Sequence, residues 1–232
     1  MSDKPLEPRS DRTSIDAFIE QARTLPATSS REHGRLIFAL DATASREATW
    51  DQASDLQSEL FFAAQDLGGL SIQLCYYRGF REFKATRFVS QTGQLLQLMN
   101  GVRCLGGITQ IGRVLRHALQ ETRGRPVKAV VFIGDCCEES VDELCHAAGE
   151  LGMLRTPVFM FQEGGDPHAQ AVFRQVSTLS GGAYAPFDRS SPQLLRELLA
   201  AVAIYASGGA KALKDYSNRS SAEVKRLTQQ IR

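Results

Sequence analysis

The chain contains an almost uninterrupted apolar run, KAVVFIGD at 128–135, that ends in an aspartate. A run of this length between turn residues is typical of a strand that is buried on both faces of a sheet. Other segments with strand character precede and follow it, and segments of helical length separate most of them. This alternation favours an α/β fold with a largely parallel sheet and helices on both of its faces.

The expected elements follow one another along most of the chain. The segments with strand character are LIFAL (36–40), LSIQLCYYRG (70–79), EFKATRFVS (82–90), KAVVFIGD (128–135), PVFMFQ (157–162) and AYAPFD (183–188). Helices are expected over 48–67, 94–99, 110–122, 139–152, 167–179 and 192–206. A turn near Gly79 is expected to join the second and third strands as an antiparallel pair. Ser207–Gly208–Gly209 is expected to end the last of these helices.

Two flanking segments differ in character from the region between them. Four apolar residues between positions 15 and 22 recur at helical spacing, which predicts a short amphipathic helix before Pro26. The last 26 residues carry six Lys or Arg residues against two acidic ones, and either a solvated helix or a docking segment fits this pattern. We therefore expect an N-terminal tail with a short helix at 1–33, a main domain at 34–206 and a basic C-terminal tail at 207–232.

The composition is that of a soluble globular protein, with 43% hydrophobic and 23% charged residues. A net charge of +1 gives no general reason to expect a nucleic acid or an anionic membrane as the partner. No run approaches the ~18 apolar residues that a membrane span requires. The N-terminal residues lack the apolar core of a secretory signal, and five cysteines, an odd number, do not resemble a disulfide framework. These features predict a cytoplasmic protein.

Small oxygen-bearing side chains gather where the predicted strands end. Asp41, Thr43 and Ser45 follow the first strand, Thr109 precedes a helix behind two glycines, and Asp135 ends the fourth strand. The carboxyl ends of parallel strands meet at one edge of a sheet, where α/β proteins form their sites. Two carboxylates and three hydroxyls make an all-oxygen set that suits Mg²⁺, and Mn²⁺ or Ca²⁺ would also fit.

This arrangement resembles the von Willebrand factor type A (VWA) domain, whose matching elements form a metal-ion-dependent adhesion site. The resemblance covers about residues 34–206 and includes FRQVSTLSGGAYAPFD at 173–188. It implies a doubly wound, Rossmann-like sheet of six strands, five parallel and one antiparallel, flanked by helices. The metal ligands that it implies are Asp41, Thr43, Ser45, Thr109 and Asp135. This chain departs from the family pattern at Thr43, where serine is usual, and at Cys136, where glycine is common.

The resemblance implies an intracellular protein–protein interaction module that binds Mg²⁺ and bridges it to an acidic residue of a partner protein. Arg46, Gly107 and Cys136 are expected on the rim that meets the partner. Intracellular members of the family often serve in larger assemblies, including ones with an ATPase, and such a partner would be consistent with the resemblance. No nucleic acid partner is expected.

Two alternatives stay open from the residues alone. A metal-dependent hydrolase or phosphoryl-transfer enzyme could use the same Mg²⁺, with Glu138 or Glu139 as its base. No Ser–His–Asp order or nucleophile elbow is visible, so we do not expect an enzyme. A metal-free scaffold would instead bind partners through its tails. Cys104, Cys136 and Cys137 lie near the candidate site, where packing or a thiol cluster would explain them.

Overall fold

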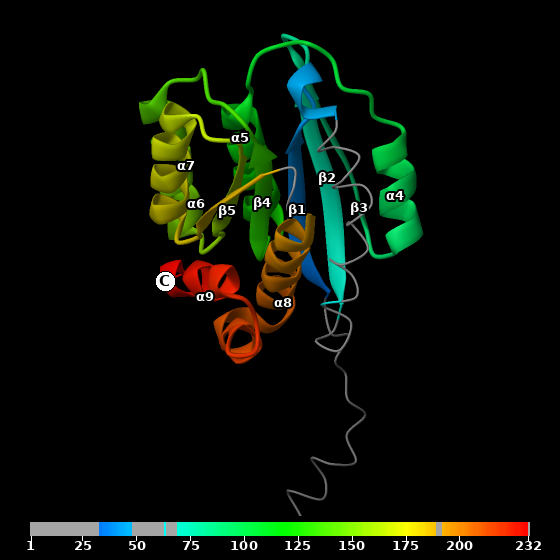
Figure 1. The fold of residues 1–232 in the computed structure, drawn as a ribbon. Coiled ribbons are helices and arrows are strands. Elements are labelled where there is room, and N and C mark those ends of the chain that lie inside the picture. Colours follow the sequence, from blue (N-terminus) through cyan, green and yellow to red (C-terminus); the bar gives the residue numbers. More distant parts are fainter. Residues whose placement is uncertain (1–32, 48–62, 64–68, 189–191, 232) are drawn as a thin grey trace, which may run out of the picture. The chain divides into compact units, whose positions relative to one another are not determined.

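The computed structural model describes residues 33–47, 63, 69–188 and 192–231, all of which belong to the compact unit His33–Arg232. These residues form a six-stranded sheet with helices on both faces (Figure 1). The strands are β1 (Gly34–Asp41), β2 (Leu70–Arg78), β3 (Glu82–Val89), β4 (Ala129–Gly134), β5 (Val158–Glu163) and β6 (Tyr184–Phe187). The helices are η1 (Ala44–Arg46), α4 (Thr92–Asn100), α5 (Ile111–Gly124), α6 (Val141–Met153), α7 (Pro167–Ser180), α8 (Pro192–Ser217) and α9 (Ala222–Gln230).

The sheet has the strand order β3-β2-β1-β4-β5-β6. Neighbouring strands are parallel except for β3, which pairs antiparallel with β2 through the turn at Gly79. The predicted α/β class and six-stranded, mostly parallel sheet are therefore confirmed. The predicted helix at 48–67 lies outside the described residues except for Ala63, and the predicted helix before Pro26 lies wholly outside them.

The central strands are apolar because both faces of the sheet are buried. In β1, Leu36 and Phe38 face one hydrophobic core, whereas Ile37 and Ala39 between them face the other. All four side chains are completely buried. Since successive side chains of a strand point to opposite faces, a strand covered on both sides carries apolar residues at successive positions.

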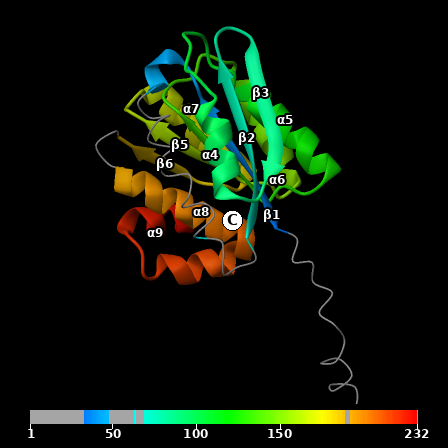
Figure 2. The ribbon, with the colours of Figure 1, turned by 90° about the vertical axis from the view of Figure 1, so that its right-hand side faces the viewer.

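Helices from different parts of the chain cover the two faces. Helices α5, α6 and α7 supply Leu115, Leu151 and Phe173 to the core on one face. Helices α4, α8 and α9 cover the other face, and Leu199 of α8 is among the side chains that they bury. Figure 2, seen from the side, shows α8 and α9 away from α5 and α6.

The residues after 206 pack against the same core, unlike the tail expected there. Helix α8 continues to Ser217, with a break at Gly209, whose φ of 73° and ψ of −171° are not helical. Leu213, Val224 and Leu227 beyond this break are buried in the core next to α8. Gly209 thus ends a first helical segment where the sequence predicted an end, and the segment that follows it packs its apolar side chains in the core.

The C-terminal helix also covers an open edge of the sheet. The backbone N–H of Tyr184 in β6 donates to Gln230 Oε1 at 2.9 Å, and Gln230 Nε2 donates to the Tyr184 carbonyl at 3.1 Å. One side-chain amide therefore makes the pair of hydrogen bonds that a further strand would make. Such cover protects an edge strand from pairing with another chain.

The order of the strands fixes where a site can form. From β1 the chain crosses to β2 on one side, and from β4 it crosses to β5 on the other side. Loops that leave β1 and β4 in opposite directions open a crevice at the carboxyl ends of these two central strands. These ends lie at the top of Figure 1. In the described part of the chain, no helix is long and apolar enough to cross a membrane.

Candidate metal centre

Asp41 is the last residue of β1 and lies almost completely buried, with 2% of its surface exposed. Its Oδ1 accepts a 2.8 Å hydrogen bond from the backbone N–H of Thr43, and its Oδ2 accepts a 3.0 Å bond from the Tyr77 hydroxyl. Tyr77 is the partner of Asp41 in the β1–β2 register. The carboxylate is therefore fixed by the strand end and by the neighbouring strand.

A hydrogen bond joins the loop after β1 to the residue after β4. Ser45 Oγ donates to Asp135 Oδ2 at 2.9 Å, and Thr43 Oγ1 lies 3.3 Å from Ser45 Oγ. The two hydroxyls and the Asp135 carboxylate thus form one connected group. The structure brings these three predicted residues together, next to the Asp41 carboxylate that Thr43 caps.

Thr109 is held against the Asp135 loop by a reciprocal pair of hydrogen bonds. The backbone N–H of Glu138 donates to Thr109 Oγ1 at 3.0 Å, and Thr109 N–H donates to Glu138 Oε2 at 3.1 Å. Glu139 accepts from the backbone N–H groups of Ile111 and Gly112 at the start of α5. A carboxylate there suits the positive end of the helix dipole, so Thr109 and α5 are positioned by the segment that follows Asp135.

The side chains fit a hard divalent cation. Asp135 Oδ1 is buried and accepts no hydrogen bond among the described residues, although a buried carboxylate oxygen normally has a partner. Beside it lies a hollow of about 340 Å³, lined by Asp135, Glu163, Gly164 and Asp188. Carboxylate and hydroxyl oxygens are the ligands that Mg²⁺ and related ions prefer. A cation would satisfy the unpaired oxygen.

The set depends on hydroxyls as much as on charge. Within the described residues, no group of three or more His, Cys, Asp or Glu side chains is arranged to hold a metal ion. A site at the predicted residues would combine the hydroxyls of Thr43, Ser45 and Thr109 with the two aspartates. This composition disfavours soft-metal binding through thiolates or imidazoles.

Burial is the main cause that raises the pKa of Asp41 above its ordinary value of 3.8. The hydrogen bonds from Thr43 and Tyr77 oppose this rise, and the charge of Asp135 adds to it. Two carboxylates that repel each other in a buried place favour any cation that lies between them.

Arg46, expected on the partner-binding rim, is buried with only 1% of its surface exposed. Its guanidinium forms an ion pair with Glu163, which ends β5 and is itself 5% exposed. A charged side chain is buried here because the opposite charge is buried with it. The buried pair ties η1 to the end of β5, so the Arg46 guanidinium does not lie on the exposed surface.

Gly107 and Cys136, the other two residues expected on the rim, lie in the segment before α5 and in the segment after β4. Gly107 is exposed, yet a Cβ on it would come within 2.0 Å of the Gly79 carbonyl oxygen, so the two backbones meet there. Cys136 is half-buried. Burial and then the Asp135 carboxylate raise the pKa of the Cys136 thiol to about 12. A thiol of this pKa is not a reactive nucleophile, which favours packing over a thiol cluster.

Tyr77 and Glu163 also contact residues of this region, although neither belongs to the predicted set. Tyr77 could have been found from strand register, since it ends an apolar segment next to the one that ends at Asp41. Glu163 follows PVFMFQ at the carboxyl end of a strand, which is the same signal that singled out Asp135. In this chain, a polar residue at the carboxyl end of a buried strand indicates a position near the candidate metal centre, even where the residue is not one of the five predicted ligands.

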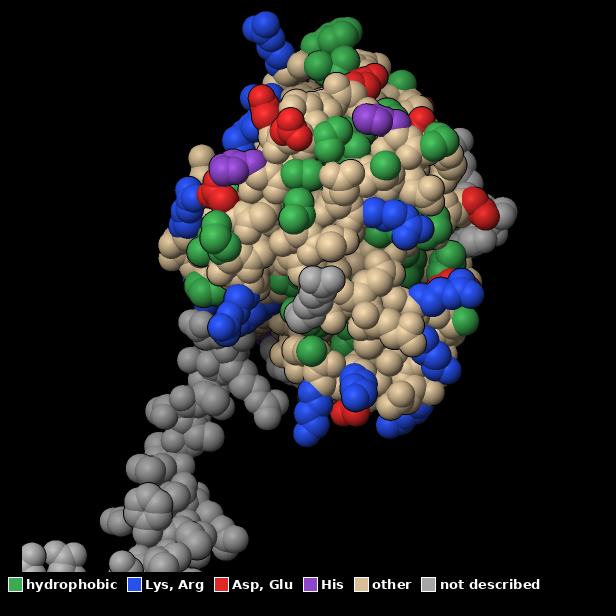
Figure 3. Space-filling view, turned by 90° about the vertical axis from the view of Figure 1, so that its left-hand side faces the viewer, with side chains coloured by type: hydrophobic (Ala, Val, Ile, Leu, Met, Phe, Trp, Pro, Cys, Tyr) green, Lys and Arg blue, Asp and Glu red, His purple; other side chains and the backbone are tan. Residues whose placement is uncertain are grey.

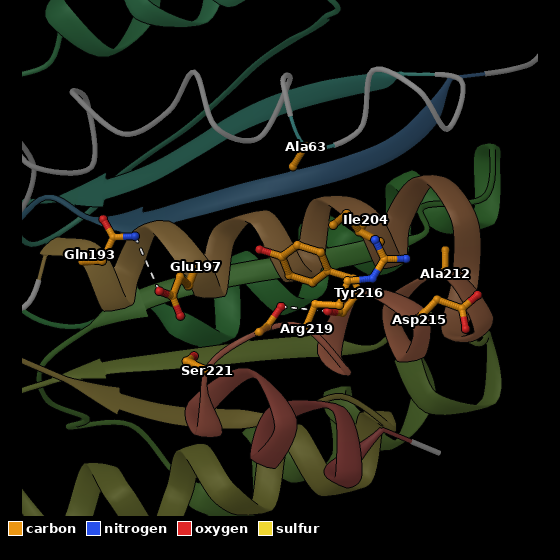
Figure 4. A pocket seen from close by; sticks show the side chains of 10 residues that line it. Ala63, Gln193, Glu197, Ile204, Ala212, Asp215, Tyr216, Arg219 and Ser221 are labelled. Carbon is orange, nitrogen blue, oxygen red and sulfur yellow. Dashed lines mark hydrogen bonds between the residues drawn. The ribbon is translucent and has the colours of Figure 1, made fainter.

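A separate groove of about 840 Å³ lies along α8 (Figure 4). Its described lining comprises Ala63, Gln193, Glu197, Ile204, Ala212, Asp215, Tyr216, Arg219, Ser220 and Ser221. The lining mixes apolar and charged side chains and includes none of the predicted metal ligands. It therefore has no part in the candidate metal centre.

No family model and no curated protein sequence matches the chain. Solved structures do. A von Willebrand factor type A protein from Catenulispora acidiphila is 14% identical, with a TM-score of 0.62 over 74% of this chain and 43% of its own. The SpRpn10 VWA domain is 11% identical, with a TM-score of 0.58 over 70% of this chain and 95% of its own.

Proximal thread matrix protein 1 of the mussel byssus, "with zinc occupied MIDAS motif", is 14% identical, with a TM-score of 0.56 over 72% of this chain and 45% of its own. This chain therefore spans less than half the length of the Catenulispora and byssus proteins. At such identities the likeness concerns the fold alone. The chain has the α/β fold of von Willebrand factor type A domains.

Proposed function

We propose that the chain is a protein-interaction module that binds Mg²⁺ at its candidate metal centre and thereby holds an acidic residue of a partner protein. The ligand set is Asp41, Thr43, Ser45, Thr109 and Asp135. The observation that carries the proposal is the buried Asp135 Oδ1, which accepts no hydrogen bond among the described residues while its Oδ2 is linked to Ser45.

Some residues of this chain would bind the ion, and others would keep those ligands in position. Tyr77 and the Thr43 backbone keep the Asp41 carboxylate in place, and Glu138 keeps Thr109 beside the Asp135 loop. Bound Mg²⁺ would supply a cationic position that attracts a carboxylate. With only two charged ligands, the centre would still favour a third negative group from outside.

The byssus protein supports a divalent ion at this place in the fold, because its metal-ion-dependent adhesion site holds zinc. For this chain Mg²⁺ is the proposed ion, since hydroxyl and carboxylate oxygens are hard ligands, and Mn²⁺ is the ion nearest to it in chemistry. Mg²⁺ would need one further oxygen ligand beyond the five that we assign, whereas Ca²⁺, which takes six to eight, would need up to three.

Binding accounts for the glutamates near the centre better than catalysis does. Glu138 accepts from Thr109 N–H, and both oxygens of Glu139 accept from the start of α5. A general base needs a free carboxylate within reach of the water that it activates. These two carboxylates already serve as caps, so we propose a module that is not an enzyme.

We also place the module in the cytoplasm, as the sequence suggested. All five cysteines are free thiols in the structure, including the buried Cys75 and Cys137. Reduced cysteines are usual in cytosolic proteins, where thiol systems keep them so.

Calorimetric titration of metal-free protein with Mg²⁺ and Mn²⁺ tests the proposal. We expect one site in the wild type and no binding in Asp41→Ala or Asp135→Ala. Asp215→Ala, which removes an exposed carboxylate on α8, is the matched control and should bind as the wild type does. Equal binding by all four proteins would place any metal outside the assigned centre.

A further inference from the structure

Exposed hydrophobic side chains gather at the end of the sheet that carries the metal centre. Phe80, Leu105 and Ile108 are 73%, 48% and 44% exposed, respectively. We call these three residues the apolar rim. Phe80 follows Gly79 in the turn between β2 and β3, and the other two lie in the segment between α4 and α5. Figure 3 shows hydrophobic side chains together at the top of the molecule, with a Lys or Arg side chain beside them.

Backbone contacts hold the apolar rim next to the metal centre. Leu105 N–H donates to the carbonyl of Ala42, which lies between Asp41 and Thr43, at 3.0 Å. Ile108 N–H donates to the Gly79 carbonyl at 3.2 Å. The rim is thus fixed to the loop that carries the first ligands.

At Gly107, the segment between α4 and α5 comes into backbone contact with the turn between β2 and β3. A Cβ at Gly107 would lie 2.0 Å from the Gly79 oxygen, so only glycine fits without displacement. Gln110 Nε2 adds contacts to the carbonyls of Arg78 and Gly79 at 3.4 and 3.3 Å. A surface built on such contacts is largely formed before a partner arrives, which lowers the entropy that binding costs.

Arginines occur in the segments that carry the apolar rim and next to them, and one of these, Arg78, forms an ion pair with Glu82. Arg113 Nη1 donates to the Arg81 carbonyl at 2.6 Å, and Arg78 Nη1 donates to the Arg103 carbonyl at 2.7 Å. Arg81 and Arg103 are exposed, and neither forms an ion pair within the described ranges. A bound cation would add to this positive charge, so the surface is complementary to a segment that is both apolar and acidic.

We propose that the apolar rim and its arginines form the partner-binding surface of the metal centre, and that its occupant is an acidic, apolar peptide segment of another protein. One carboxylate of the segment meets the bound ion, its apolar side chains cover Phe80, Leu105 and Ile108, and a second acidic residue pairs with Arg81 or Arg103. The inference rests on the proposed function and identifies the class of partner that the centre selects.

Continuity with the metal centre favours a peptide over a membrane or a second copy. An ion in the centre needs a carboxylate at a defined place beside the rim, which a peptide provides. A net charge of +1 gives the chain little attraction to an anionic bilayer. Among the other exposed hydrophobic residues, Met153, Leu154 and Leu179 lie at the C-terminal ends of α6 and α7, at the end of the sheet opposite to the apolar rim, so they do not extend the rim into a wider membrane-binding face.

Selection from a peptide library tests the inference. Short displayed peptides with one fixed glutamate and random neighbours are selected on the wild type in Mg²⁺ and eluted with chelator. We expect enrichment of large hydrophobic residues near the glutamate and of a second acidic residue. The absence of enrichment, or enrichment without hydrophobic neighbours, would overturn the inference.

Variants of the apolar rim then test whether its side chains contact the peptide. For the enriched peptide, Phe80→Ser and Ile108→Ser should each raise the dissociation constant about tenfold or more, as expected for side chains central to an interface. Leu179→Ser, which changes a 47% exposed leucine at the end of α7, is the matched control and should bind as the wild type does. All three variants should keep the Mg²⁺ affinity of the wild type.

The outcomes separate the two proposals. A wild type that binds no Mg²⁺ overturns the proposed function together with this inference. Mg²⁺ binding with a peptide that binds Phe80→Ser as tightly as the wild type overturns the inference alone. Self-association, or binding to phosphatidylserine vesicles, that Phe80→Ser abolishes would assign the rim to a second copy or to a membrane and would also overturn it.

Discussion

Ser45 Oγ donates a 2.9 Å hydrogen bond to Asp135 Oδ2, and this bond joins the loop after β1 to the residue that follows β4. The two residues are far apart in the sequence but lie at the ends of neighbouring central strands. The other Asp135 oxygen is buried without a hydrogen bond among the described residues. Ser45 therefore orients a carboxylate whose free oxygen is available to a cation.

Ser45→Ala should weaken Mg²⁺ binding at least about tenfold, because it removes a proposed ligand and the donor that orients Asp135. Ser45 is exposed, so the free energy of unfolding should change by no more than about 0.5 kcal/mol. Calorimetry and urea denaturation measure the two effects. Ser45→Thr retains a hydroxyl and should retain most of the affinity, and equal affinities in the alanine variant and the wild type would contradict this role.

The raised pKa of Asp41 predicts how stability depends on pH. The unfolded chain releases this proton near the ordinary pKa of 3.8, whereas the folded protein releases it at higher pH. The stability contribution is thus fully present below 3.8 and is lost as the pH rises through the folded pKa. In metal-free protein, the unfolding free energy of the wild type relative to Asp41→Asn should fall over this range.

Saturating Mg²⁺ should offset that loss in the wild type, because the ion binds the ionised carboxylate, and it should not affect Asp41→Asn. Urea denaturation at a series of pH values, with and without Mg²⁺, measures the difference. A wild-type pH profile that Mg²⁺ leaves unchanged would show that Asp41 does not bind the ion.

Gly107→Ala should destabilise the protein by about 1–3 kcal/mol, since its Cβ would overlap the Gly79 carbonyl and force the two loops apart. Gly106→Ala is the control, because a Cβ there meets nothing within 4 Å. Thermal and urea unfolding of both variants provides the measurement. Similar stabilities of the two variants would mean that the loops are not in close contact.

Arg46 and Glu163 should depend on each other for stability. Removing either charge alone leaves the other buried, so Arg46→Met or Glu163→Leu should cost about 3–5 kcal/mol. The double variant Arg46→Met/Glu163→Leu should recover much of that loss. A double-mutant cycle by urea denaturation measures the coupling, and additive effects would exclude a direct buried pair.

The C-terminal helix should contribute to the stability of the fold. Leu227→Ala creates a cavity at a side chain that is 1% exposed, and we expect a loss of about 2–5 kcal/mol. Lys225→Ala, on the exposed side of the same helix, should change little. If the leucine variant is as stable as the lysine variant in urea, α9 is a detachable tail.

The sheet could be predicted from the sequence because burial on both faces leaves a clear pattern. KAVVFIGD has apolar residues at nearly every position between its ends, and this strand is central. The β2–β3 turn was also predictable, because Gly79 adopts a φ of +58°, which favours glycine. At these places the local sequence favours the same structure that the tertiary packing requires.

The burial of Arg46 and the packing of α9 could not be predicted from the sequence pattern. Arginine is normally exposed, and only the tertiary contact with Glu163 explains why this one is buried. Ser207–Gly208–Gly209 predicts the break that α8 has at Gly209, but it does not predict that Leu213 beyond the break is buried in the core. In both cases a partner distant in the sequence decides the outcome.

Anomalous diffraction from Mn²⁺-soaked crystals is the most direct test of the metal centre. We expect one strong peak between the ends of β1 and β4, with Asp135 Oδ1 among the ligands of the ion and with Ser45, Thr43, Thr109 and Asp41 around it. A peak elsewhere on the molecule, or no peak in protein that is folded and saturated with Mn²⁺, would contradict the account.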